Sequence, residues 1–195
     1  AVRRSTFDDV FVRPSRAAVS LASGAALQLH RVAPGASRNA LAVVDSVFRV
    51  ILVSQYQQMS GLNDGGGALA VLDELARPPH GSSAHFAVNI TRCRFEQNFL
   101  GAAGAVLLQT HDSVDVRPTS SLDVASSVFE HNSASFGSCS ACAFPSHTLL
   151  FLRAGGAITT LSQFLGISAI RIADCSFNGS SATLLGGSLF LTGAN

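Results

Sequence analysis

The feature that most constrains the fold of this chain is a pair of short motifs that recur in a fixed order. The sequence "FEQN" at 95–98 precedes a glycine-alanine step and the apolar run "VLL", and "FEHN" at 129–132 precedes "GGAI" at 155–158. Alignment on one phenylalanine per unit divides the 195 residues into five units, at Phe7, Phe48, Phe95, Phe129 and Phe177. Repeats of this size that cannot bury a face alone form stacked arrays.

Other positions repeat around the phenylalanines. Four of the units have apolar residues five and seven positions upstream, as at Leu41 and Val43. A glycine followed by Ala or Ser leads into a short apolar strand, such as "LAVL" at 69–72. A small residue stands two positions upstream in every unit: Ser5, Ser46, Cys93, Ser127 and Cys175. Short strands with a two-residue period, broken by Gly or Asn, indicate an all-β fold.

We predict a single-stranded parallel β-helix of about five coils, with long loops at the corners. Equivalent positions would stack ~4.8 Å apart, so the phenylalanines would form a core column and the Ser/Cys positions a narrow inner corner. Asn98 and Asn132 would bond along the axis as an asparagine ladder. Glycine before alanine would form another corner, because glycine tolerates positive φ and close approach of the backbone. One segment spanning 1–195 would contain coils near 2–29, 40–72, 86–108, 122–161 and 167–193, and we expect it to be part of a longer chain.

Two further columns are polar in every unit, and the charge often alternates in sign from one unit to the next. This pattern is typical of outward positions that face their neighbours. The residues directly after each phenylalanine are Asp8, Arg49, Glu96, Glu130 and Asn178. The residues three positions before it are Arg4, Asp45, Arg92, Ser126 and Asp174.

Composition narrows the classes of function. Charged residues make up 13% of the chain and the net charge is +1, so a nucleic-acid partner is not expected. No apolar run reaches the ~18 to 20 residues of a membrane helix, so we expect no transmembrane segment in this chain. Possible N-glycosylation sequons at Asn89 and Asn178, together with an even number of cysteines, favour a secreted protein that is extracellular or at the cell surface.

The cysteines favour structural roles over a metal-binding or catalytic role. Cys139 and Cys142 are close enough in sequence for a local disulfide, whereas a zinc site needs about four ligands and no second pair of ligands is present. Cys93 and Cys175 share a column two coils apart, roughly 10 Å, so they are expected to be buried free thiols. No cofactor or metal is expected.

An enzyme of the β-helical type would need carboxylates clustered on one outer face. Glu96 and Glu130 would lie about one coil apart with Arg92 near them, while the adjacent Asp8 and Asp9 would point to opposite faces. We interpret the glutamates as a solvated polar column, because there is no Trp and only one Tyr to stack on a sugar. A polysaccharide lyase or glycoside hydrolase remains the alternative function.

The insertions differ between units while the coils repeat, so specific function is expected in the loops. Insertions after the glycine-alanine strand would line one edge, and insertions after the phenylalanine would line another. The first group is 30–39, 73–85, 109–121 and 162–166, and the second is 11–23, 53–65 and 133–154.

The motif pair resembles the repeat of the polymorphic outer-membrane proteins of chlamydiae. The match is good at Phe95–Asn98, Phe129–Asn132, Gly66–Leu69 and Gly155–Ile158, and partial in the other units. The resemblance implies a right-handed, pectin-lyase-like parallel β-helix that is exported and serves adhesion or scaffolding rather than catalysis. Its partners would be other protein chains or cell-surface or matrix glycans at the loop edges. End-to-end or lateral assembly, as a subunit of an extracellular filament or appendage, is a further alternative.

Overall fold

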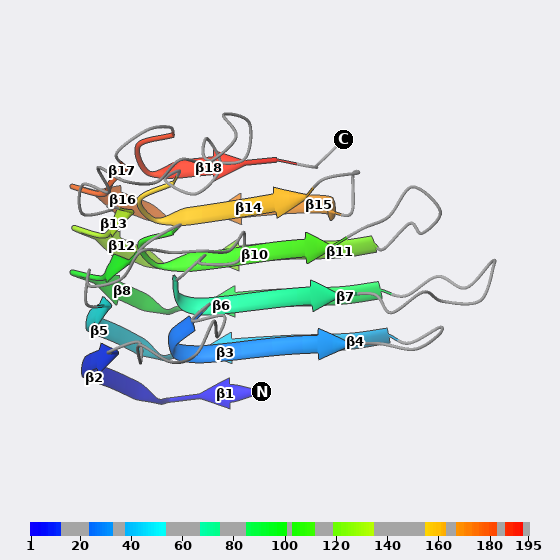
Figure 1. The fold of residues 1–195 in the computed structure, drawn as a ribbon, viewed down its shortest axis with the longest axis horizontal. Helices are drawn as coiled ribbons and strands as arrows, with labels where there is room; N and C mark the ends of the chain where they lie inside the picture. Colours follow the sequence, from blue (N-terminus) through cyan, green and yellow to red (C-terminus); the bar gives the residue numbers. More distant parts are fainter. Residues whose placement is uncertain are drawn as a thin grey trace, which may run out of the picture.

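The computed structural model describes residues 1–12, 24–32, 38–53, 67–74, 85–100, 103–111, 119–134, 155–162, 167–182 and 186–192. Within these ranges the fold is all-β, without a helix, and every strand pairing is parallel. Figure 1 shows the strands stacked from β1 and β2 at the bottom to β18 at the top.

The strands form three sheets, which we name A, B and C. Sheet A contains β1 (Val2–Arg3), β4 (Arg38–Val44), β7 (His85–Thr91), β11 (Thr119–Ala125) and β15 (Ile167–Ala173). Sheet B contains β2 (Thr6–Val12), β5 (Val47–Val53), β8 (Arg94–Glu96), β9 (Phe99–Leu100), β12 (Val128–Glu130), β13 (Ser133–Ala134), β16 (Ser176–Asn178) and β17 (Ser181–Ala182). Sheet C contains β3 (Gly24–Val32), β6 (Gly67–Glu74), β10 (Val106–His111), β14 (Ile158–Ser162) and β18 (Leu189–Leu191).

The chain visits sheets A, B and C in that order five times, and we call each visit a pass. The passes are β1–β3, β4–β6, β7–β10, β11–β14 and β15–β18. Each pass places one strand or a pair of short strands on its predecessor in every sheet. Contacts are therefore mostly between residues one repeat apart, as expected for a stacked array.

The register brings like residues together. In sheet A, Leu41 pairs with Val88 and Val88 with Leu122, and all three side chains are buried. The burial of β7 alternates strictly along the strand, because successive side chains point to opposite faces. One face of sheet A is thus apolar and faces the core, while the other consists mostly of small or polar residues.

Two corners in each pass have a left-handed backbone, which the sequence analysis did not identify. The first corner lies three residues before the phenylalanine, at Arg4, Asp45, Arg92, Ser126 and Asp174, with φ between 49° and 54°. The second lies two residues after it, at Asp9, Val50, Gln97, His131 and Gly179, with φ between 52° and 61°. These residues let the strand bend from sheet A to sheet B and again within sheet B.

Glycine is present at the glycine-alanine step for two separate reasons. Among the described glycines directly before Ala or Ser, only Gly187 has the predicted positive φ, at 40°; in the fourth pass the positive φ of 69° falls one residue earlier, at Gly155. Gly104 is constrained by space instead, because an added Cβ would lie 2.0 Å from the backbone oxygen of Gly156. Close approach of successive passes therefore requires glycine at the second site.

The middle strands of sheet C, β6, β10 and β14, are buried on both faces. Leu69, Val106 and Ile158 pair in register and belong to the main core. Ala70 and Leu107, on the opposite face, are also completely buried and form a second cluster with Ala103. Sheets A and B therefore supply most of the outward surface of the described residues.

Candidate functional site

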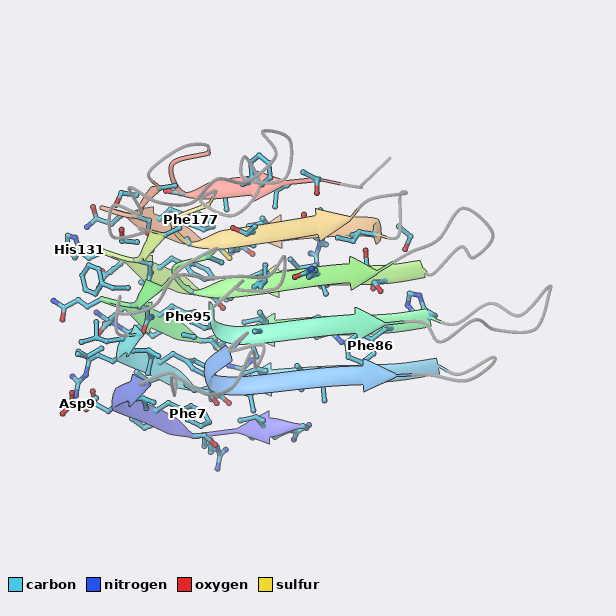
Figure 2. The ribbon with its side chains drawn as sticks, in the orientation of Figure 1. Phe7, Asp9, Phe86, Phe95, His131 and Phe177 are labelled. Carbon is cyan, nitrogen blue, oxygen red and sulfur yellow. The ribbon has the colours of Figure 1, made fainter. Side chains whose placement is uncertain are left out.

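The five phenylalanines aligned in the sequence form a single stacked file inside the molecule. Successive ring centroids lie 4.8 to 5.0 Å apart, and the interplanar angles are between 2° and 14°. Phe48, Phe95 and Phe129 are fully buried, whereas the end members Phe7 and Phe177 are half-buried. Figure 2 shows Phe7, Phe95 and Phe177 lying one above another within the stack.

Asn98 and Asn132 form the ladder along the same axis. Nδ2 of Asn98 donates to Oδ1 of Asn132 at 2.8 Å and to the backbone oxygen of Phe48 at 3.1 Å. Oδ1 of Asn98 accepts from the backbone nitrogen of Ile51 at 3.1 Å, and Nδ2 of Asn132 donates to the oxygen of Phe95 at 2.9 Å. Each asparagine thus satisfies backbone groups of the preceding pass, where the bend leaves them without a strand partner.

The Ser/Cys positions occupy the inner corner between sheets A and B. Oγ of Ser127 accepts from the backbone nitrogen of Cys93 at 3.1 Å and donates to the oxygen of Ala125 at 2.9 Å. Cys93 is a buried free thiol, and burial raises the pKa of its Sγ. Cys175 is also free but only partly buried, so the expectation of full burial is wrong for this residue, which lies in the outermost pass.

The outer face of sheet B is the candidate surface on which charged side chains gather. The Arg49 guanidinium donates twice to Asp8, with Nε–Oδ1 at 3.0 Å and Nη2–Oδ2 at 2.5 Å. This interaction holds the pKa of Asp8 below its ordinary value. At the preceding corner, Arg92 donates to Asp45 in the same two-pronged way, at 2.6 and 3.0 Å, and lowers the pKa of Asp45.

Two expectations about this face are wrong. Arg92 was expected to lie near Glu96 and Glu130, but it forms its ion pair with Asp45. Asp8 and Asp9 are both exposed rather than on opposite faces, because the positive φ of Asp9 interrupts the strand alternation. In Figure 2, Asp9 lies at the outer edge of the stack, as His131 does.

Glu96 and Glu130 pair in register on adjacent strands, and Arg94 bridges them. Its Nη2 lies 2.9 Å from Oε2 of Glu130, and its Nε bonds Glu96. Glycoside hydrolysis needs one protonated and one ionised carboxyl group. Here a single guanidinium contacts both carboxylates, Glu96 through Nε and Glu130 through Nη2.

The remaining predicted residues fall in different surroundings. Asn89 lies on the outward face of β7 and is half-buried, whereas Asn178 ends β16 and is exposed. Cys139 and Cys142 lie outside the described residues, so their disulfide stays a prediction. The loop insertions also lie largely outside them, although the strand ends that flank 75–84 and 112–118 are stacked in register.

Neither a metal centre nor a membrane helix is found in the described part of the chain. No three His, Cys, Asp or Glu side chains within these ranges gather closely enough to hold a metal ion. In the same ranges no helix has the length and apolar character that are needed to cross a bilayer. Comparison with protein-family models, curated proteins and solved structures finds no significant match to this chain.

Proposed function

We propose that the chain is a right-handed, single-stranded parallel β-helix in which each pass is one coil. We further propose that it serves as a non-enzymatic structural or adhesion module in the extracellular space or at the cell surface. In this role the coils form a stiff rod, and the segments inserted between strands contact protein or glycan partners.

The continuous internal file is the observation that supports this proposal best. Rings stacked at 4.8 to 5.0 Å run through all five passes without interruption. Outside, the pairs Asp8–Arg49, Asp45–Arg92 and Asp123–Arg171 each join two passes. An array that repeats the same core at every step, with ion pairs between successive passes, resists bending, which is useful in a spacer or scaffold.

The position of the inserted segments supports a role in contact. Residues 33–37, 75–84, 112–118 and 163–166 all connect a strand of sheet C to the next strand of sheet A. Their flanking strands are stacked in register, so all four segments start and finish at one edge of the rod. Variable segments on a rigid frame are a common arrangement for binding.

The bridging of Glu96 and Glu130 by Arg94 disfavours the polysaccharide lyase or hydrolase alternative. A screen of neutral and acidic polysaccharides with the whole chain should therefore show no cleavage. Cleavage that is lost in Glu96→Gln or Glu130→Gln would overturn the non-enzymatic proposal.

Contact through the edge can be tested on a panel of glycans and extracellular-matrix proteins. Replacement of 75–84 and 112–118 by Gly-Ser linkers of equal length should abolish binding while thermal unfolding is unchanged. The control replaces Ser121 and Ala169, on the outward face of sheet A, by Thr and should bind as the original chain does. Binding that survives replacement of both segments would contradict the proposed use of these loops.

A further inference from the structure

The first of the two sequons, at 89–91, lies in the middle strand of sheet A, β7, between β4 and β11. Burial alternates along this strand, so Asn89 and Thr91 point away from the core and are half-buried. Ile90 between them is completely buried. The amide and the hydroxyl of this sequon therefore lie on one outward face, whose surroundings are formed by the neighbouring passes.

Short side chains surround Asn89 on this face. Directly beside it in register are Ala42 on β4 and Asp123 on β11. Arg171, the long side chain of this column, lies beyond Asp123 and bonds it at 3.2 Å. None of the neighbours of Asn89 along β7 and on the two adjacent strands is aromatic or has a long aliphatic chain. These neighbours are Ala40, Val44, Ala87, Thr91, Ser121 and Ala125.

The second sequon, at 178–180, is arranged differently. Asn178 is exposed at the end of β16, and Gly179 follows it with a φ of 61°. Ser180 lies beyond this corner, and its Oγ is buried. Of the two sequons, only that of Asn89 therefore keeps the amide and the hydroxyl together on an outward face.

We propose that Asn89 is an attachment site for an N-linked oligosaccharide that projects from the outward face of sheet A. The proposal rests on the extracellular role given above, because the transfer takes place on exported chains. The donor would be a lipid-linked oligosaccharide diphosphate. A bond forms between Nδ2 of Asn89 and the anomeric carbon of the first sugar, and the bond from that carbon to the diphosphate breaks. The lipid diphosphate leaves with the electron pair, and Nδ2 gives up a proton to a base of the transferase.

The fold leaves room for a sugar at this position. Transfer to an exported chain precedes folding, so a position inside a strand does not prevent it. The short neighbours of Asn89 then allow the sugar to stay outside the folded sheet. Sheets that pack face to face lie about 10 Å apart, so a branched oligosaccharide here would keep another sheet from packing on this face. The inserted segments and the outer face of sheet B would stay open to partners.

Secretion of the whole chain from a eukaryotic host with an appended leader peptide tests the site. Asn178→Gln removes the other sequon, so any N-linked sugar on this variant is on Asn89. The variant should lose mass after enzymatic release of the glycan, and peptide mass spectrometry should find a carboxylate in place of the amide at position 89. In the same background, Thr91→Val keeps the β-branched shape and should abolish the modification. Thr91→Ser keeps the hydroxyl and is the matched control that should retain it.

Thermal unfolding shows whether the fold accepts the sugar. The glycosylated chain should unfold at the same temperature as the enzymatically stripped chain, or at a higher one. A secreted Asn178→Gln chain that unfolds cooperatively but has no sugar on Asn89 would overturn the proposal, as would a glycosylated chain that unfolds at a lower temperature than the stripped one. Neither result bears on the contact role of the edge segments, which the panel of glycans and matrix proteins tests separately.

Discussion

The side-chain amide nitrogen of Asn98 donates to the side-chain oxygen of Asn132 at 2.8 Å, and both side chains are completely buried. The same amide satisfies the oxygen of Phe48 and the nitrogen of Ile51, so one side chain joins three passes. This bond is an axial contact made by side chains, whereas most contacts between passes are backbone pairs in the sheets. Its removal therefore tests the bend in sheet B separately from the strands.

Replacement of Asn98 by Leu should destabilise the chain by roughly 3 kcal/mol. Leucine is similar in size to asparagine but cannot hydrogen-bond, so the buried oxygen of Phe48 and nitrogen of Ile51 lose their partner. Chemical denaturation followed by circular dichroism measures the change. Ser176→Ala, at an exposed position of β16, is the control and should change the unfolding free energy by less than about 0.5 kcal/mol. A loss below about 1 kcal/mol for Asn98→Leu would mean that the ladder contributes little.

Ser180 occupies the next position of the asparagine column, and its Oγ is buried without a hydrogen-bond partner in the described structure. Ser180→Asn should extend the ladder toward the backbone of the fourth pass and add about 1 kcal/mol of stability. Ser180→Ala only removes the unsatisfied hydroxyl and should gain less. Because Ser180 completes the sequon of Asn178, the original chain and both variants should be made in a host without N-glycosylation. A Ser180→Asn protein no more stable than Ser180→Ala would contradict the extension.

Replacement of a stacked phenylalanine should lower the free energy of unfolding most in the middle of the file. Phe95→Ala should cost about 3–5 kcal/mol, because the ring is fully buried between two others and its loss leaves a cavity. Phe177→Ala should cost clearly less, because this ring is half-buried and has one stacked neighbour. Equal losses at the two sites in denaturant titrations would show that stability does not follow position in the file.

Val50 is a β-branched residue with a φ of 52°, a conformation that is costly for this side-chain type. Val50→Asn should stabilise the chain by roughly 1 kcal/mol, since asparagine adopts the left-handed region readily. The matched control is Val47→Asn, three residues earlier in β5, where φ is not positive and asparagine should be destabilising. Thermal and denaturant unfolding should thus move in opposite directions for the two variants.

The pair Asp45–Arg92 predicts a specific dependence on pH. The Arg92 guanidinium lowers the pKa of Asp45 from its ordinary value of 3.8, so the pair adds stability above that value. This contribution is lost as pH falls through the lowered pKa of the folded chain. Asp45→Asn should therefore flatten the loss of stability in acid, as should Arg92→Gln, and high salt should reduce the difference because the pair is exposed. An unchanged acid profile in both variants would contradict this account.

Sequence reasoning identified the columns, including the two polar ones that contain the pairs Asp8–Arg49 and Asp45–Arg92, but it did not identify the left-handed corner residues or the partners of Arg94. The phenylalanine and asparagine positions could be found because burial restricts the side chain, so the same residue type recurs. The left-handed corners could not, since Arg4, Asp45, Arg92, Ser126 and Asp174 share a backbone conformation and no side-chain type. Likewise, Arg94 and Arg92 differ by two positions in the sequence, and the positive φ at Arg92 sends them to different acidic partners.

The sequence by itself determined that the chain is a parallel stack and which residues lie over one another. A repeated apolar pattern can be buried only when successive units superpose, and this requirement fixes the register of Phe48 on Phe95 and of Leu41 on Val88. Only the tertiary structure decided which residues at the bends adopt a left-handed backbone and which acidic groups Arg94 meets. Those outcomes depend on the direction of each side chain at a corner, and the residues that settle it come from separate passes of the chain.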